Sequence, residues 1–312
     1  MSIIEKAITK LDQDKNSATG QIATSHEAGM AEAGQSDQRE PTRIKSIDSK
    51  AKIAKPPEPV QQSDSSHSRK VEFDLEKLQQ LGMVTPETER SSIAEEFRRI
   101  KRPILDKIFN TNGTRNHHNN LVMVSSSLAG EGKTFCAVNL AISIALELDH
   151  TVLLVDADVA RPSVARYLKV APDQGPPRTG LMDIIQDKNL DLADVMLRTN
   201  IDKLTLLCAG NHHKHATELL ASHSMSKLLN EISERYPDRV IIFDSPPLLL
   251  STEARVLTSQ MGHIVLVVEA ESTTQHAVRE VLNQLKSTSN VSLIYNKARE
   301  FSGGDYYGDY YG

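Results

Sequence analysis

A lysine and a threonine stand together where a small-residue loop leads into a helical pattern. The loop reads Ser126-Ser-Leu-Ala-Gly-Glu-Gly-Lys-Thr134 and follows an apolar run. In a strand–loop–helix unit of this kind, backbone N–H groups converge on a phosphate, the lysine reaches the phosphates, and the hydroxyl completes a Mg²⁺ shell. The strict motif has glycine where Ser127 stands. The loop therefore predicts phosphate binding, but it needs support from the rest of the chain.

Carboxylates directly follow two other apolar runs. Asp156 and Asp158 end one of them, and Asp244 ends another. Ligands of an open α/β sheet bind at the carboxyl ends of the strands, so we expect these side chains beside the phosphate loop. Mg²⁺ keeps several waters, so Thr134 with one or two carboxylates suffices to hold it. Together these residues predict a site for a nucleotide with Mg²⁺.

The spacing of Asp156 and Asp158 suits phosphoryl transfer. At positions i and i+2 of an extended chain, both side chains point to the same side. One can serve the water shell of the metal, and the other can accept a proton from an incoming hydroxyl.

The C-terminal segment offers hydroxyl groups in a glycine-rich, acidic sequence. They belong to four of the chain's seven tyrosines: Tyr306, Tyr307, Tyr310 and Tyr311. A flexible tether gives an effective concentration of about a millimolar at a site within its reach. We predict that this cluster is a substrate, with a sticky low-complexity end as the alternative.

Apolar runs alternate with helical patterns from residue 119 onward. The runs are Leu121–Val124, Val152–Val155, Leu204–Leu207, Val240–Phe243, Ile264–Val268 and Val291–Tyr295. Helical patterns lie near 133–147, 179–187, 214–235, 252–260 and 273–287. Continuous apolar strands that alternate with helices are typical of a mostly parallel sheet buried on both faces. We predict a three-layer α/β P-loop NTPase domain over residues 119–300.

The remaining residues divide by composition. Residues 1–15 have a short amphipathic helix pattern, which either docks nowhere in particular or binds a partner or a membrane surface. Residues 16–70 are polar and lack aromatic residues, so we predict a disordered linker. Residues 71–118 form a helical lead-in segment, and 301–312 form a flexible tail.

An amphipathic helix is predicted within the lead-in segment. Its apolar face is formed by Ile93, Phe97, Ile100 and Ile104. Pro103 is expected to kink or interrupt it. The basic residues lie mostly off the apolar face, where they are either solvated or part of an oligomer surface.

The composition indicates a soluble protein. The 312 residues are 39% hydrophobic and 25% charged, and no apolar run approaches the ~20 residues that cross a bilayer. We therefore expect a cytoplasmic protein. Its net charge of −5 speaks against nucleic-acid binding over the whole chain. Cys136 and Cys208 are expected to be buried, reduced thiols.

These motifs resemble those of the bacterial protein-tyrosine kinases of exopolysaccharide loci, in particular the stand-alone autokinases linked to PEP-CTERM/exosortase clusters. Residues 126–134 resemble the family's Walker A motif, in which serine is accepted at the first position. Val152-Leu-Leu-Val-Asp-Ala-Asp-Val-Ala-Arg-Pro162 resembles Walker A′, and Val240-Ile-Ile-Phe-Asp-Ser-Pro-Pro247 resembles Walker B. Glu95-Glu-Phe-Arg-Arg-Ile-Lys101 is similar to the family's subunit-contact motif, and the tail is similar to its autophosphorylation cluster.

The resemblance implies a role for each matched residue. Lys133 would bind the β- and γ-phosphates of ATP, and Thr134 would bind Mg²⁺ directly. Asp156 would belong to the Mg²⁺ shell and to the catalytic carboxylates with Asp158, while Asp244 would hold a metal-bound water. The ATP-binding residues would be Ala129, Gly130, Glu131, Gly132, Lys133, Thr134 and Phe135. The resemblance also implies autophosphorylation of the tail in trans within a ring-like homo-oligomer.

The resemblance also implies partners. Glu95, Arg98 and Lys101 would contact the next subunit, and the cytoplasmic segment of a membrane-embedded polysaccharide co-polymerase would recruit the protein to the inner membrane face. Lysine stands where arginine usually ends the contact motif, unless the register is Glu96, Arg99 and Arg102.

Two further departures lie near the predicted site. Ala160 stands where arginine is frequent in the family. A stretch with His212, His213 and His215 replaces a Pro/Asn-rich one, and we expect a surface loop there.

Two other functions compete with a kinase. A regulatory ATPase of the partition or cell-division-site class shares the order of strands and motifs. Those proteins carry a signature lysine early in the phosphate loop, where this chain has Leu128, and they lack a tyrosine tail. A nucleotide-gated scaffold of an export complex is the third possibility, although it would have no need to retain Asp156, Asp158 and Asp244 together.

Overall fold

A computed structural model describes residues 70–109, 118–168, 179–236, 238–286, 288 and 290–298. The predicted N-terminal helix, nearly all of the predicted linker and the tyrosine tail lie outside these residues. Among the described helices, none is long and apolar enough to cross a membrane.

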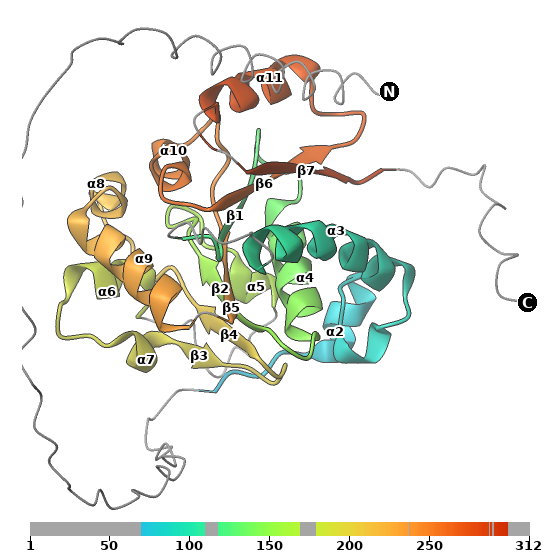
Figure 1. Ribbon diagram of the computed structural model, residues 1–312, viewed down its shortest axis with the longest axis horizontal. Helices are drawn as coiled ribbons and strands as arrows, with labels where there is room; N and C mark the ends of the chain where they lie inside the picture. Colours follow the sequence, from blue (N-terminus) through green and yellow to red (C-terminus); the bar gives the residue numbers. More distant parts are fainter. Residues whose placement is uncertain are drawn as a thin grey trace, which may run out of the picture. The chain divides into compact units, whose positions relative to one another are not determined.

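A seven-stranded sheet forms the centre of the described part (Figure 1). The strands are β1 (Leu121–Ser126), β2 (Thr151–Asp156), β3 (Leu197–Arg198), β4 (Leu204–Leu207), β5 (Arg239–Asp244), β6 (His263–Glu269) and β7 (Val291–Asn296). Their order across the sheet is β3-β4-β2-β5-β1-β6-β7. All pairs are parallel except β3 with β4. The predicted α/β fold with a mostly parallel sheet is confirmed.

The register of the central strands brings the predicted site residues together. β5 lies between β1 and β2, and Asp244 pairs in register with Asp156 on one side and with Val124 on the other. Because these strands are parallel, the loops that follow them leave the same edge of the sheet. The phosphate loop after β1 therefore lies at the edge that carries both aspartate-ended strands.

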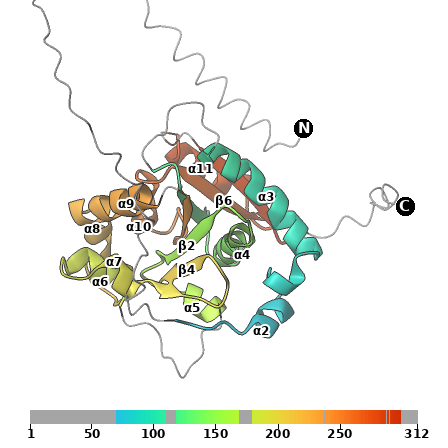
Figure 2. The ribbon, with the colours of Figure 1, turned by 60° about the horizontal axis from the view of Figure 1, so that its bottom comes forward.

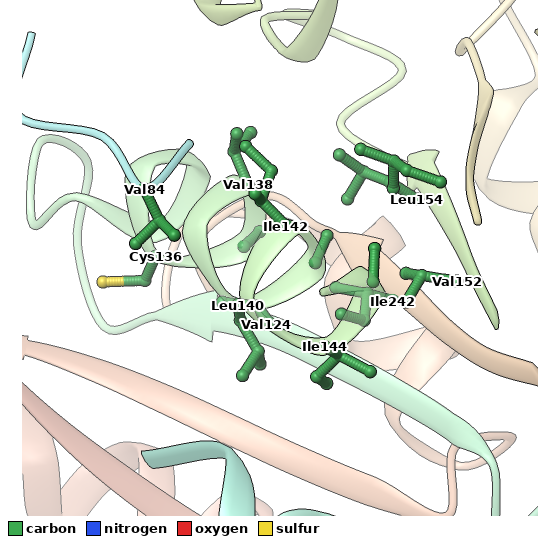
Figure 3. Packing of buried hydrophobic residues seen from close by; sticks show 14 of the residues in the cluster. Val84, Val124, Cys136, Val138, Leu140, Ile142, Ile144, Val152, Leu154 and Ile242 are labelled. Carbon is green, nitrogen blue, oxygen red and sulfur yellow. The ribbon is translucent and has the colours of Figure 1, made fainter. Parts of the chain in front are cut away.

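Alternate residues of the central strands face opposite layers of helices. One set packs against α4 (Lys133–Ala145), as Figure 3 shows for Val124, Val152, Leu154 and Ile242. The other set is equally buried and comprises Leu121, Met123, Leu153, Val155, Ile241 and Phe243. Strands buried on both faces explain why their sequences are continuously apolar.

The remaining helical elements surround the sheet. They are α2 (Leu75–Gln80), η2 (Pro86–Thr88), α3 (Ser92–Phe109), α5 (Val164–Tyr167), α6 (Leu181–Gln186), α7 (Leu192–Val195), α8 (Ala216–Leu220), α9 (His223–Arg235), α10 (Thr252–Thr258) and α11 (Gln275–Gln284). Figure 2 shows α3 and α4 on one side of the sheet and α8 and α9 on the other.

The lead-in segment packs into the same core as the sheet. Phe73, Leu78 and Phe97 are buried in the cluster that contains α4 and one face of the strands. The backbone N–H of Val84 donates to Asn139 Oδ1 of α4 at 2.7 Å.

The structure corrects several local predictions. β3, α5 and α7 were not predicted, and β3 makes the sheet seven-stranded and partly antiparallel. The helical pattern over 214–235 is two helices, because Ser222 caps the start of α9 with its side chain. Pro103 does not interrupt α3, which runs from Ser92 to Phe109. Cys136 and Cys208 are buried and unpaired, as predicted.

Candidate active site

The phosphate loop connects β1 to the N-terminus of α4. Gly130 and Gly132 have φ angles of 91° and 94°, which glycine adopts without strain. Gly132 is the N-cap residue of α4, a helix of 13 residues. The N–H groups at such a helix start attract anions, so Lys133 and Thr134 begin the helix where a phosphate would bind.

Lys133 lies between two of the predicted carboxylates. Its Nζ atom is 3.0 Å from Asp158 Oδ2 and 3.9 Å from Asp244 Oδ1. Its side chain is 13% exposed. The lysine and both carboxylates therefore share one site, as the sequence predicts.

Thr134 links the helix start to Asp244. Its hydroxyl donates to Asp244 Oδ2 at 2.7 Å and lies 3.0 Å from the hydroxyl of Ser163. Asp156 Oδ2 accepts from the backbone N–H groups of Ser163 and Val164 at 2.9 and 3.0 Å. Ser163 was not among the residues predicted from the sequence. Its place after the Walker A′ motif and directly before a short helix is the signal that would have identified it.

Two of the three carboxyl groups have strongly raised pKa values. Burial raises the pKa of Asp244 to about 7, against the opposing charge of Lys133. Burial also raises the pKa of Asp156 to about 6, and the negative charge of Asp158 adds to it, while the N–H donors of Val164 and Ser163 oppose it. Each of these groups holds a proton more tightly than an ordinary aspartic acid does.

The carboxylate oxygens of this cluster fit a divalent cation. Asp156 Oδ1 and Asp244 Oδ1 are buried and have no hydrogen-bond partner among the described residues. A cation near them would replace the missing partners and favour the ionised carboxylates. In the described part of the chain no group of three or more His, Cys, Asp or Glu residues could hold a metal.

The predicted ATP-binding residues follow one another along the loop and the first turn of α4. Ala129 and Gly130 are exposed there, whereas Glu131 is 3% exposed and turns inward. A carboxylate oxygen of Glu131 accepts from the N–H of Leu128 at 2.9 Å, and the other accepts from the hydroxyl of Thr273. The side chain of Glu131 therefore shapes the loop and leaves phosphate binding to the backbone.

The side chain of Phe135 packs against α3. Its ring packs edge-on against Phe97 of α3, with the ring centroids 6.4 Å apart. Only its backbone N–H, in the first turn of α4, is placed to contribute to phosphate binding.

The predicted oligomer contacts on α3 divide into exposed and buried residues. Glu95 and Arg98 are partly exposed and form an ion pair with each other. Lys101 is buried, which corrects the expectation that it faces another subunit. Its Nζ atom donates to the carbonyl of Ser143 at 2.5 Å and lies 2.7 Å from Glu147. The alternative register of the motif is exposed, since Glu96, Arg99 and Arg102 all lie on the outside of α3.

The histidine stretch forms a loop between β4 and α8. His212 and His215 are exposed, and His213 is partly exposed, in agreement with the predicted surface loop. The rings of His213 and His215 lie 5.7 Å apart. The predicted acceptor tyrosines Tyr306, Tyr307, Tyr310 and Tyr311 lie outside the described residues.

One family model matches the part of the chain that contains the whole predicted site. The family model described as an AAA domain matches residues 119–297, from the residues before β1 to the end of β7. The match covers the phosphate loop and all three aspartate positions.

Two relatives differ in how much of their length this chain covers. The putative tyrosine-protein kinase CapB of Staphylococcus aureus is 27% identical over 225 residues, which cover 72% of this chain and 92% of CapB. The succinoglycan biosynthesis transport protein ExoP of Rhizobium meliloti strain 1021 is 28% identical over 252 residues. That match covers 77% of this chain but only 30% of ExoP. The chain thus spans nearly all of one relative and less than a third of the other.

A solved structure supports the relationship. The crystal structure of the VpsO kinase domain is 28% identical to this chain, with a TM-score of 0.51. The comparison covers 67% of this chain and all of that domain.

Proposed function

The chain belongs to the AAA-domain family, and on this premise we propose that it is an ATP-dependent protein-tyrosine autokinase. The observation that carries the proposal is the meeting of Lys133, Asp158 and Asp244 at the phosphate loop. Support comes from the relatives, since CapB and VpsO are named as kinases. The proposed substrates are ATP and tyrosine hydroxyls, above all those of the chain's own C-terminal cluster.

The side chains of the site suit transfer of the γ-phosphoryl group. Lys133 would bind the β- and γ-phosphates and neutralise charge that develops on them. Asp156 or Asp158 would accept the proton of the attacking tyrosine hydroxyl. Asp156 Oδ1 has no hydrogen-bond partner among the described residues, which leaves one oxygen of this carboxylate free for such a role.

The metal-binding residues complete the proposal. Thr134 would bind Mg²⁺ directly, Asp156 would belong to its shell, and Asp244 would hold a metal-bound water. When bound, Mg²⁺ supplies positive charge that draws electrons from the phosphate oxygens. The hydrogen bond from Thr134 to Asp244 keeps both groups on the same side of the loop.

The proposed cellular setting is exopolysaccharide production. The relative ExoP is named for succinoglycan biosynthesis and transport, and the motifs resemble those of the stand-alone kinases of PEP-CTERM/exosortase loci. We include in the proposal a ring-like homo-oligomer and recruitment to the inner membrane face by a membrane-embedded co-polymerase. On α3, the exposed register of Glu96, Arg99 and Arg102 offers the better contact surface.

A regulatory ATPase of the partition type remains the second candidate, because it shares the order of strands and motifs. Leu128 speaks against it, since this residue stands where that class has its signature lysine and is 38% exposed. The two candidates differ in where the phosphate goes. A kinase transfers it to the protein, whereas an ATPase releases it.

Intact mass spectrometry after incubation with Mg-ATP tests the proposal. We expect successive additions of phosphate to the full chain, and none after removal of the residues that follow Gly304. Hydrolysis of ATP without phosphate retained on the protein would refute the kinase and favour the ATPase.

Two variants separate the acceptor from the catalytic site. Lys133→Met should abolish phosphorylation, because the phosphates lose their cation. Replacing Tyr306, Tyr307, Tyr310 and Tyr311 by Phe should leave ATP binding intact and remove most phosphotyrosine. Full phosphorylation of Lys133→Met would overturn the site assignment, and strong labelling of the Phe variant would overturn the assignment of the tail.

A further inference from the structure

The end of β7 holds the phosphate loop from outside. Asn296, the last residue of β7, donates from Nδ2 to the carbonyl of Glu131 at 2.9 Å. Lys297 donates from Nζ to the carbonyl of Gly130, also at 2.9 Å. Two consecutive residues thus bind two consecutive carbonyl groups of the loop. None of the motifs in the sequence analysis included either residue.

The side chain of Lys297 is itself held in place. Its ammonium lies 3.0 Å from Glu269 Oε1, at the end of the neighbouring strand β6. Its backbone has a φ of 56°, which is uncommon for a residue other than glycine. Left-handed backbone of this kind costs free energy and persists where the surrounding structure requires it. A residue with this unfavourable backbone conformation beside the phosphate loop is therefore a candidate for a functional role.

The packing around Asn296 is equally close. A Cβ atom on Gly132 would lie 2.1 Å from Asn296 Nδ2, so the amide can keep its present position only beside a glycine. Gly132 has a φ of 94°, which disfavours other residues independently. The amide of Asn296 and the loop therefore fix each other's positions.

Fixing these carbonyl groups also orients the N–H groups of the loop. In a trans peptide unit the C=O and N–H bonds point in opposite directions. The carbonyl of Gly130 shares its peptide unit with the N–H of Glu131, and the carbonyl of Glu131 shares its unit with the N–H of Gly132. Because both carbonyls point toward the end of β7, both N–H groups point away from it. They are the groups that would have to converge on a phosphate.

We propose that Asn296 and Lys297 are positioning residues for nucleotide binding, which act by orienting the peptide units of Gly130 and Glu131. The inference rests on the proposed function only in that the loop binds a nucleotide. It holds equally for a kinase or an ATPase. Without Lys297 the exposed part of the loop would sample other peptide orientations, and the nucleotide would bear the cost of ordering it.

The decisive variant is Lys297→Asn. Asparagine tolerates the left-handed backbone better than most residues, so the variant removes the ammonium and retains the turn. We expect ADP with Mg²⁺, measured by calorimetry, to bind roughly tenfold more weakly, the effect of one charge-assisted hydrogen bond. The melting temperature of the nucleotide-free protein should stay within about 2 °C of the unmodified chain, because the side chain is half exposed.

Two companion variants complete the experiment. Lys297→Arg retains a cation for Glu269 and the carbonyl of Gly130, so it should recover most of the affinity. Lys286→Asn makes the same substitution at an exposed lysine before the start of β7 and should bind ADP normally. Unchanged affinity in Lys297→Asn would overturn the proposal. So would a loss of affinity accompanied by a drop of more than about 5 °C in the nucleotide-free melting temperature, since Lys297 would then be merely structural.

Because the readout is binding and not phosphotyrosine, the test stands apart from the kinase proposal. A protein that binds ADP but never phosphorylates itself would refute the proposed kinase and leave the role of Lys297 open to confirmation. A kinase whose Lys297→Asn variant binds ADP normally would refute only the positioning role.

Discussion

At the scale of single residues, Asp244 is the group of the site that most destabilises the folded protein when no ligand is bound. It is fully buried at the end of β5, with one oxygen bound by Thr134 and the other without a hydrogen bond among the described residues. Lys133 is its nearest cation, at 3.9 Å, and Asp158 holds that lysine more closely. A carboxylate placed in this way destabilises the free protein and favours a bound cation. The destabilising effect of Asp244 should therefore be measurable as a lower unfolding free energy of the nucleotide-free protein.

Asp244→Asn should stabilise the metal-free and nucleotide-free protein at high pH. The folded-state pKa of Asp244 is raised to about 7 from 3.8, so the folded state holds the proton more tightly than the unfolded state. The stability that this proton contributes is complete below about pH 4 and is lost as the pH rises to about 7. Asparagine mimics the protonated form and avoids the loss. We expect its advantage in unfolding free energy, measured in urea with EDTA, to grow by about 2–4 kcal/mol between pH 4 and 8.

Asp244→Asn should also bind Mg-ATP poorly. The carboxylate that destabilises the free protein would then be the one that the ligand needs. Glu231→Gln is a suitable control, because it neutralises an exposed carboxylate on α9. Between pH 4 and pH 8, Asp244→Asn should gain more stability relative to the unmodified chain than this control does. A constant difference between Asp244→Asn and the unmodified chain at pH 4 and pH 8 would contradict the argument.

At the scale of elements, long and strongly apolar segments could be predicted and short ones could not. All six predicted strands are present, and the aspartates at their ends meet as the parallel sheet requires. β3 has two residues, and α5 and α7 have four residues each, too few for any periodicity to be visible. The break between α8 and α9 depends on a serine cap inside a pattern that is helical on both sides.

The side chains that support the site were the hardest to predict. Ser163, Asn296 and Lys297 act through hydrogen bonds to residues far away in sequence, or to backbone atoms whose direction only the fold determines. Lys101 is a residue whose exposure was predicted wrongly for the same reason. Its position in a basic run suggested exposure, yet the carbonyl of Ser143 and the carboxylate of Glu147 satisfy its charge inside the protein.

Lys101→Met should destabilise the contact between α3 and α4. The carbonyl of Ser143 would lose its donor, and Glu147, which is 21% exposed, would be rehydrated only in part. We expect the unfolding free energy to fall by about 1–3 kcal/mol. Burial raises the pKa of Glu147, but the hydrogen bond and charge of Lys101 outweigh it and hold this pKa below its usual value. The contribution of the pair should therefore be complete above the ordinary glutamate pKa of 4.5 and fade as the pH falls below it.

Arg102→Met is the matched control for Lys101→Met. Arg102 lies 3.3 Å from the same Glu147 oxygen, but its side chain is 61% exposed. Its loss should cost less than about 1 kcal/mol. Equal effects of the two variants in urea unfolding would show that burial of Lys101 does not strengthen the contact.

At the scale of the whole described part, α4 connects the nucleotide site to the outer surface of the protein. Its first residues form the phosphate loop, Phe135 packs on Phe97, and the carbonyl of Ser143 near its end accepts from Lys101. Phe97 and Lys101, which make these two contacts, belong to α3. The outer face of the same helix carries Glu96, Arg99 and Arg102. A subunit contact on this face of α3 would therefore be coupled to a nucleotide in the loop through the packing of α3 against α4, which favours an assembly that responds to the state of the site.

Phosphorylation of the tail should dissociate such an assembly. Each phosphate adds about 1.5–2 negative charges, so four would add roughly 6–8 to a chain whose net charge is −5. Tails gathered in one oligomer would repel one another and the carboxylates Asp156 and Asp158, and the repulsion would weaken as salt screens it. We expect light scattering after size-exclusion chromatography to show a smaller mass once Mg-ATP has been consumed, with a weaker effect in high salt. The chain in which Phe replaces Tyr306, Tyr307, Tyr310 and Tyr311 should keep its mass under the same treatment. An equal mass of the unmodified chain before and after phosphorylation would show that the charge of the tail does not control assembly.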